Sequence, residues 1–129
     1  MNTNKLEYYF VYGTLKQGHG NNRILQQSST AKFIENAITE PNFTMISLGA
    51  FPGVIEGGNT AIHGEIWSVE DDETKRRLDS LEGYYKNNPE SSLYIKQQIK
   101  LNDKTVNIYI LNRVYNNTTN IIIKNGIWN

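Results

Sequence analysis

The chain contains 129 residues, of which thirteen are Lys or Arg and thirteen are Asp or Glu, so its formal net charge at pH 7 is zero. A chain of this length is expected to form one domain, residues 1–129, around one hydrophobic core. The balanced charge leaves no positive excess to neutralise phosphates, so nucleic acid is not an expected partner. The lack of cysteine excludes disulfides, thiolate metal sites and a Cys nucleophile.

The apolar runs of the chain are short. None approaches the ~18 residues that span a bilayer. The run that ends at Gly13 is also too short for the apolar region of a signal peptide. We therefore expect a cytoplasmic protein with no membrane partner, present as a monomer or a weak homodimer.

The first elements are a strand and a loop. Residues 6–12, LEYYFVY, are apolar and rich in β-forming side chains, which predicts a strand buried on both faces. Residues 13–22, GTLKQGHGNN, contain three glycines and two asparagines, a composition that favours a shaped loop. A short helical turn is expected at residues 23–27.

A series of strands and then a helix follow. Residues 31–69 contain short β-prone segments that prolines and a Gly-Gly pair interrupt. At Ser68 the pattern changes, because four acidic residues follow soon after a residue type that caps helices. A helix is therefore expected from Ser68 to near Leu81, with Gly83 as its stop signal.

The last third predicts a hairpin. Residues 92–101 and 105–111 are β-rich, and Asn102-Asp103-Lys104 joins them as a turn. Val106, Ile108 and Ile110 alternate and are expected on one face. Many short strands with one main helix predict a mixed, barrel-like α+β domain.

The C-terminal residues carry weaker signals. Residues 116–120, NNTTN, are expected to form a loop. Residues 121–128, IIIKNGIW, predict either a final edge strand or a docking tail.

The Gly-rich loop is first tested as a phosphate site. It opens like a P-loop, but His19 and Gly20 stand where Lys and Ser or Thr are required. It does not complete a dinucleotide fingerprint either. The Gly13-Thr14-Leu15 turn remains, as a plain tight turn or as a place where several backbone N–H groups point at one oxyanion.

Metal and triad chemistry find little support in the sequence. His19 and His63 are the two imidazoles, so a three-ligand metal site would need carboxylates to complete it. No Ser stands in a G-x-S-x-G motif. We expect no metal ion.

Glu82 is the carboxylate with the most unusual setting. It follows Leu78 and Leu81 at helical spacing and stands close to two tyrosines. Apolar and aromatic neighbours disfavour the charged form of a carboxyl group and raise its pKa towards the range of a proton acceptor and donor. The alternative is an ordinary surface glutamate at a helix end. The charged residues between 71 and 77 are interpreted as the solvated helix face.

Several segments, taken in order and spacing, resemble the γ-glutamylcyclotransferase-like family, above all its γ-glutamylamine cyclotransferase group. The resemblance runs from about residue 8 to about residue 111. The matching segments are Tyr12-Gly13-Thr14-Leu15-Lys16-x-Gly18, Asn22 with Leu25, Phe51-Pro52-Gly53, Gly64-Glu65-Ile66-Trp67, Leu78-Asp79-x-Leu81-Glu82-Gly83-Tyr84, and Tyr94 with Tyr109.

The resemblance implies a fold and an activity. The fold is a small mixed β-barrel flanked by one main helix and short helical turns. The activity is an intramolecular acyl transfer that converts a γ-glutamyl amine or γ-glutamyl amino acid into 5-oxoproline and a free amine, without a cofactor. The resemblance implies that Glu82 is the catalytic acid/base, and that the substrate is bound by Tyr12, Gly13, Thr14, Leu15, Pro52, Tyr94 and Tyr109.

Two departures from the family pattern bear on the substrate. The chain reads Tyr94-Ile95-Lys96 where the family often has Tyr-x-Arg, and Lys lacks the bidentate fork of Arg. A polar insertion at residues 86–92 is expected to reshape one wall of the pocket. Two other functions stay open: a binding protein that holds a small metabolite without turnover, and an interaction protein that uses the C-terminal tail.

Overall fold

The computed structural model describes residues 5–115 and 121–129, so the loop expected at residues 116–120 lies outside the described residues. The helices within these ranges are α1 (Arg23–Gln26) and α2 (Asp72–Leu81). Short 3-10 turns occupy Gly20–Asn22, Pro89–Ser91 and Arg113–Tyr115. The strands are β1 (Glu7–Val11), β2 (Lys32–Ile38), β3 (Phe43–Ser47), β4 (Pro52–Glu56), β5 (His63–Val69), β6 (Tyr94–Leu101), β7 (Lys104–Leu111) and β8 (Ile121–Ile122).

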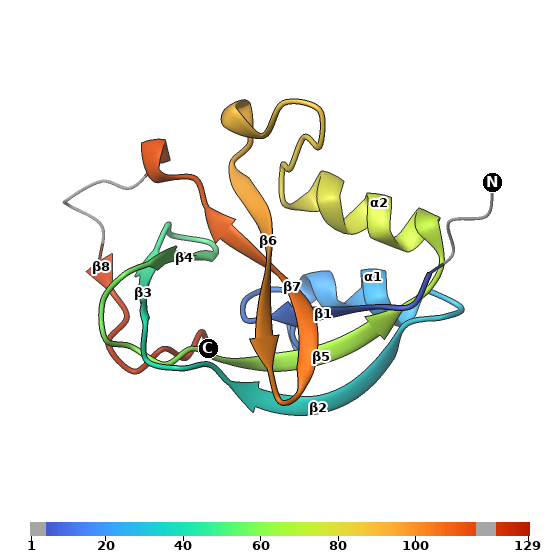
Figure 1. Ribbon diagram of the computed structural model, residues 1–129, viewed down its shortest axis with the longest axis horizontal. Helices are drawn as coiled ribbons and strands as arrows, with labels where there is room; N and C mark the ends of the chain where they lie inside the picture. The colour runs from blue at the N-terminus through green and yellow to red at the C-terminus, as the bar shows by residue number, and fades with distance from the viewer. Residues whose placement is uncertain (1–4, 116–120) are drawn as a thin grey trace.

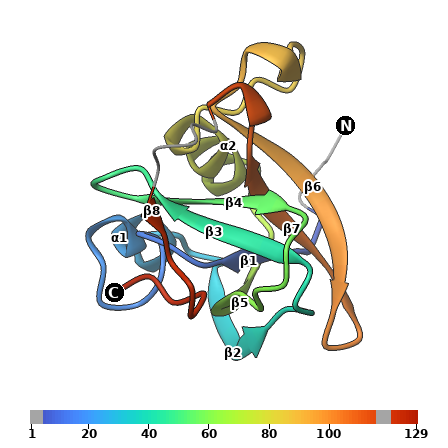
Figure 2. The same ribbon diagram turned by 90° about the vertical axis from the view of Figure 1, so that its left-hand side faces the viewer.

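The strands form two sheets. One has five strands in the order β2-β5-β1-β7-β6, and the other has three in the order β4-β3-β8. In both views β2 and β5 curve beneath β1, while α2 lies above it (Figures 1 and 2). Figure 2 turns the small sheet, β3, β4 and β8, towards the viewer. The α+β class expected from the sequence is confirmed.

The expected closed barrel is not seen in the described part of the chain. The two sheets share no ladder there, and β4 meets β7 through side-chain packing instead. Gly53 allows this close approach, since a Cβ at that position would stand 3.0 Å from Leu111 Cδ2. The domain is therefore a pair of packed sheets.

Strand β1 lies at the centre of the large sheet, between β5 and β7. Its pairing with β5 is antiparallel and its pairing with β7 is parallel. Tyr9 and Val11 point into one hydrophobic cluster and Phe10 into another. The prediction of a strand buried on both faces is confirmed, because alternate residues of a strand face opposite sides.

The hairpin of β6 and β7 forms as expected. Asn102 and Asp103 adopt positive φ angles of 51° and 64°, as a tight two-residue hairpin turn requires. Val106, Ile108 and Ile110 all enter the same hydrophobic cluster.

Helix α2 begins later than the sequence suggests. Ser68 is a buried residue of β5, paired with Tyr8 of β1, so the expectation that it caps the helix is wrong. Asp71 is the cap, and it accepts a hydrogen bond from the Thr74 backbone N–H. The helix ends at Leu81 and Gly83 follows with a φ of 64°, as expected.

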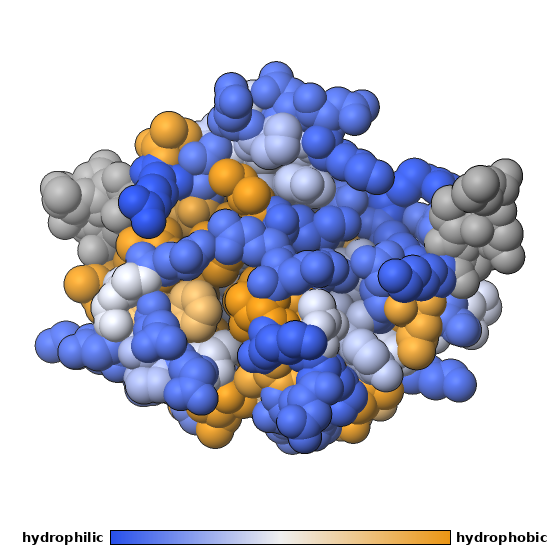
Figure 3. All heavy atoms as spheres, in the orientation of Figure 1, coloured by the Kyte–Doolittle hydropathy of each residue, from blue (hydrophilic) through white to orange (hydrophobic). Residues whose placement is uncertain are grey.

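The C-terminal segment supplies an edge strand. Ile122 of β8 pairs with Ile46, and beyond the strand the His63 N–H donates to the Gly126 carbonyl at 3.0 Å. Ile121 and Ile122 are exposed, and Figure 3 shows apolar surface on the side where Figure 1 places β8. No helix in the described ranges is both long enough and apolar enough to cross a bilayer.

Asp71 joins the start of α2 to the loop that follows α1. Its carboxylate accepts hydrogen bonds from the Thr74 N–H at 2.9 Å, from the Ser28 hydroxyl at 3.0 Å and from the Thr30 hydroxyl. Desolvation alone would raise the pKa of Asp71, but the hydrogen bonds from Thr30, Thr74 and Ser28 hold it well below its usual value.

We predict that Asp71→Ala lowers the free energy of unfolding at pH 7 by about 1–2 kcal/mol, the cost of losing a helix cap. A depressed pKa stabilises the fold above the unfolded pKa of about 3.9, and that contribution is lost as the pH falls further. The difference between wild type and variant should therefore shrink below about pH 4. Urea denaturation at pH 7 and pH 3 measures it, and an equal difference at both pH values would contradict this role.

Candidate active site

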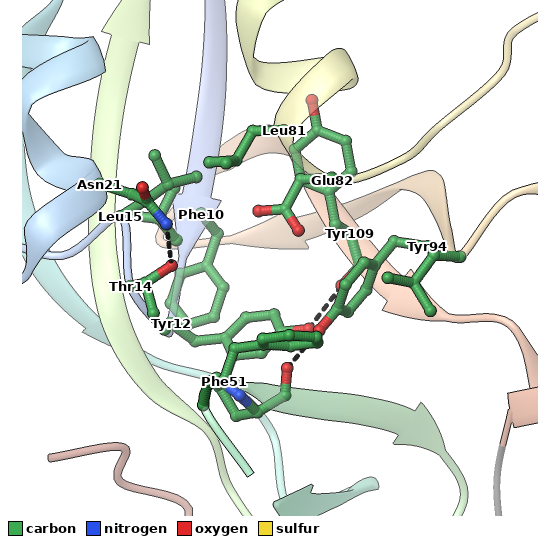
Figure 4. Close-up of a pocket in the computed structure, with 15 residues that line it drawn as sticks. Phe10, Tyr12, Thr14, Leu15, Asn21, Phe51, Leu81, Glu82, Tyr94 and Tyr109 are labelled. Carbon is green, nitrogen blue, oxygen red and sulfur yellow. Dashed lines mark hydrogen bonds between the residues drawn. The ribbon is translucent and has the colours of Figure 1, made fainter. Parts of the chain in front are cut away.

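A cavity of about 270 Å³ opens between the end of β1, the Gly-rich loop and the C-terminal end of α2 (Figure 4). All eight residues that the sequence suggested for the site line this one cavity. They are Tyr12, Gly13, Thr14, Leu15, Pro52, Glu82, Tyr94 and Tyr109.

The floor of the cavity is the turn after β1. The chain reverses there through a hydrogen bond from the Lys16 N–H to the Gly13 carbonyl at 3.1 Å. Gly13 is required because a Cβ would stand 2.9 Å from Pro52 Cγ. The buried Asn22 side chain donates to the Leu15 carbonyl at 2.7 Å and holds the turn from the other side.

Three successive backbone N–H groups of this turn lack an acceptor among the described residues. Within residues 5–115 and 121–129, the N–H groups of Gly13, Thr14 and Leu15 donate to no other group. Backbone donors next to a cavity rarely stay unsatisfied without water or a ligand. Three such groups in succession can bind an anion or an oxyanion.

Glu82 stands across the cavity from Thr14 and Leu15, at the C-terminal end of α2 (Figure 4). The residue is partly exposed, but protein atoms surround its carboxyl group, which points into the cavity. That group accepts no hydrogen bond from the described residues. Burial, with a smaller contribution from the nearby Asp79 carboxylate, raises the pKa of Glu82 to about 7.

The three tyrosines of the site present their aromatic rings to the cavity. Each hydroxyl proton is already donated within the protein. The Tyr12 hydroxyl donates to the Tyr109 carbonyl at 2.7 Å, and the Tyr94 hydroxyl donates to the Pro52 carbonyl. The Tyr109 hydroxyl donates to Asp79 Oδ1 at 2.6 Å. Burial raises the pKa of Tyr12, Tyr94 and Tyr109 above the usual value, so all three stay protonated near neutrality. They can shape a substrate pocket and accept hydrogen bonds.

The cavity also includes residues that the sequence did not single out as site residues. Asn21 donates from its side chain to the Thr14 hydroxyl at 2.8 Å, which leaves its amide oxygen free to accept. Its signal was its position in the Gly-rich loop. The other additional residues are apolar: Phe10, Val11, Ala50, Phe51, Leu81 and Leu93.

The charges near the cavity are few. Its described lining contains no Lys, Arg or His, and Glu82 is its charged side chain. Lys96, which stands where the family often has Arg, lies behind the wall and contacts Asp79 Oδ1 at 3.1 Å. In the described part of the chain, no three His, Cys, Asp or Glu side chains gather as a metal site. The absence of a metal or cofactor from the reaction stays a prediction.

The polar insertion, residues 86–92, contributes no residue to the described lining of the cavity, and it leads into Leu93, which does line it. Ser92, at its end, is fully buried and its hydroxyl accepts a hydrogen bond from the Tyr85 N–H at 2.8 Å. The Leu93 N–H donates to the Gly83 carbonyl at 3.0 Å, which brings Leu93 into the wall next to Glu82.

The chain is similar to curated proteins named for gamma-glutamylcyclotransferase and to the solved structure of one of that family. A Vibrio cholerae protein, provisionally named a gamma-glutamylcyclotransferase, is 42% identical over 73 residues, which span 57% of this chain and 59% of that relative. The gamma-glutamylcyclotransferase family protein ytfP of Citrobacter rodentium is 28% identical over 92% of both chains. The solution structure of ytfP from Escherichia coli matches with a TM-score of 0.70 and 26% identity, covering 94% of this chain and 95% of that one.

A family model described as gamma-glutamyl cyclotransferase, AIG2-like, matches residues 9–129, which include β1, the Gly-rich loop and Glu82. The match covers more than half of the chain, and the fold agrees with that of a family protein. The chain therefore belongs to the AIG2-like gamma-glutamyl cyclotransferase family.

Proposed function

We propose that this protein closes the ring of a γ-glutamyl amine or γ-glutamyl amino acid, releasing 5-oxoproline and a free amine. One observation carries the proposal: among residues 5–115 and 121–129, the enclosed Glu82 carboxyl group has no hydrogen-bond partner, and it faces the N–H groups of Gly13, Thr14 and Leu15, which have none either. The substrate supplies what each side of the cavity lacks. Its amine is a partner for Glu82, and its γ-carbonyl oxygen is an acceptor for the turn.

The bond changes need one proton shuttle. The α-nitrogen of the glutamyl group, as the neutral amine, attacks its own γ-carbonyl carbon and forms the new C–N bond of the ring. Glu82 takes a proton from this nitrogen and gives it to the leaving nitrogen as the original C–N bond breaks. Atoms and charge balance without any cofactor.

The turn stabilises the charge that develops on the carbonyl oxygen. The N–H groups of Gly13, Thr14 and Leu15 are held by the fold, so they need no reorganisation during the reaction. The rings of Tyr12, Tyr94 and Tyr109 restrict the glutamyl chain to a folded shape in which its amine lies near its γ-carbonyl. Ring closure is then favoured over an extended bound form.

The leaving amine is the part of the substrate that is to be identified. The described lining of the cavity includes Leu81, Leu93 and Phe51 and contains no cation that could bind a second carboxylate. Incubation with a panel of γ-glutamyl amines and γ-glutamyl amino acids, with 5-oxoproline and free amine as readouts, defines the substrate. Ligand retained without 5-oxoproline would favour the binding-protein alternative.

A cytoplasmic location and a monomer or weak homodimer stay predictions.

We predict that Glu82→Gln lowers turnover by at least about 10²-fold while substrate binding is kept, because Gln preserves the shape but cannot accept a proton. Release of 5-oxoproline from the γ-glutamyl panel measures the effect. Glu73→Gln is the matched control, since it removes one carboxylate from the exposed side of the same helix. Undiminished release by the Glu82 variant, or an equal loss in the Glu73 variant, would defeat the assignment.

We also predict that kcat/KM rises with pH around a midpoint near 7. The unprotonated carboxylate is the form that accepts the substrate proton, and burial raises the pKa of Glu82 to about 7. Well below the midpoint the rate should fall about tenfold for each pH unit. A profile measured from pH 4 to 9 with its midpoint near 4.5, the ordinary glutamate value, would show that the carboxyl group is not desolvated during catalysis.

A further inference from the structure

Asp79 lies on the same face of α2 as Glu82, because residues three apart on a helix are neighbours. Its carboxylate does not line the cavity. It accepts the Tyr109 hydroxyl at 2.6 Å and the Lys96 ammonium at 3.1 and 3.2 Å. The ring of Tyr109 does line the cavity, so Asp79 is connected to the site through the tyrosine that it holds.

Lys96 is enclosed together with Asp79. Both side chains are only 22% exposed. The ammonium lies over the rings of Tyr84 and Tyr9, at 5.4 and 5.8 Å from their centroids. Charges shielded from water in this way act on their neighbours more strongly than surface charges do.

The pair and its surroundings come from four elements and the segment that follows α2. Lys96 comes from β6, Tyr109 from β7 and Tyr9 from β1, while Tyr84 follows α2. On α2 itself, Lys75 lies one turn before Asp79, contacting Glu7 of β1 at 3.0 Å and Asp72 at 3.8 Å. Tyr12 and Tyr94 are the other titratable groups that face Glu82. Asp79 is the charged group that acts on Glu82, and Lys96 is the cation that pairs with Asp79.

We propose that Asp79 and Lys96 form a positioning pair in which Asp79 fixes Tyr109 and favours the protonated form of Glu82, while Lys96 limits that effect. The inference rests on the proposed function, because the pair would set the pH range in which Glu82 is ionised and can accept the substrate proton. Asp79 opposes a second negative charge one turn away. Lys96 offsets part of this opposition, so removing either charge moves Glu82 in a predictable direction.

The test measures the pKa of Glu82 directly. The side-chain carboxyl carbon of Glu82 in ¹³C-labelled protein is followed by NMR from pH 4 to 10, and the spectrum of Glu82→Gln assigns it. Asp79→Asn should lower the pKa of Glu82 by about half a unit or more, because it removes the repelling charge and leaves Lys96. Lys96→Gln should raise it by a similar amount, because Asp79 then acts without compensation.

Three further variants separate charge from structure. Lys96→Arg keeps the charge and should leave the midpoint within about 0.2 units. Asp79→Asn combined with Lys96→Gln should give a value between those of the two single variants. Glu73→Gln removes an exposed charge that lies about 13 Å from Glu82 along the helix axis. It should leave the pKa of Glu82 unchanged.

The outcomes distinguish this inference from the proposed function. Opposite shifts in the two single variants support the pair, and the same shifts should appear in the midpoint of kcat/KM against pH. Shifts of the same sign, or none in either variant, would overturn it even if the wild type releases 5-oxoproline. A wild type that releases none removes the proposed function, while the NMR titration still decides whether the pair acts on Glu82. If Asp79→Asn fails to fold, Lys96→Gln alone gives the sign: a raised pKa of Glu82 supports the pair, and an unchanged or lowered pKa overturns it.

Discussion

The site depends on a carboxyl group that the fold encloses without a hydrogen-bond partner in the part of the chain that the structure describes. An ionised carboxylate loses much of its hydration when it is buried, and normally a protein compensates with hydrogen bonds or a cation. Asp71 shows the ordinary solution, with its carboxylate satisfied by Thr74, Thr30 and Ser28. Glu82, one helix length away, has none of these contacts, and burial raises its pKa instead. The contrast places a group that can exchange protons near pH 7 at the end of α2.

The opposite wall depends on how firmly the turn after β1 is held. Asn22 binds the Leu15 carbonyl, and Glu65 of β5 accepts the Gln17 N–H at 3.0 Å and the Trp67 indole N–H at 3.0 Å. Lys16 donates to the Trp128 carbonyl at 2.7 Å, which ties the C-terminal segment to the same loop. These contacts use the groups around the turn, and the N–H groups of residues 13–15 donate to none of the described residues. Hydrogen bonds on both sides hold the loop in place, and the N–H groups of residues 13–15 are available to bind a ligand.

Sequence patterns predicted the elements whose signals are local. The apolar run of β1, the turn at Asn102 and Asp103, and the stop at Gly83 each depend on neighbouring residues and were placed correctly. The prediction that Ser68 caps the helix was wrong because its pairing in β5, which is a tertiary contact, competes with its preference for capping positions. Closure of the sheets depends on how β4 meets β7, a contact between residues far apart in sequence such as Gly53 and Leu111. The Gly13-Thr14-Leu15 turn and Glu82 were candidates from their own sequence setting, and the family resemblance supplied the other four site residues. The sequence contained no sign that the tyrosine hydroxyls are used internally, or that Asp79 and Lys96 pair behind the wall.

The measurement that tests the central claim most directly is a titration of ¹⁵N-labelled protein with 5-oxoproline, followed by two-dimensional NMR. The account predicts saturable downfield shifts of the amide protons of Gly13, Thr14 and Leu15, since these groups gain an acceptor when the lactam product occupies the cavity. The shifts should be accompanied by a change in the Glu82 carboxyl carbon. Saturable shifts confined to another part of the surface, or amides at residues 13–15 that stay unchanged at saturating product, would contradict it.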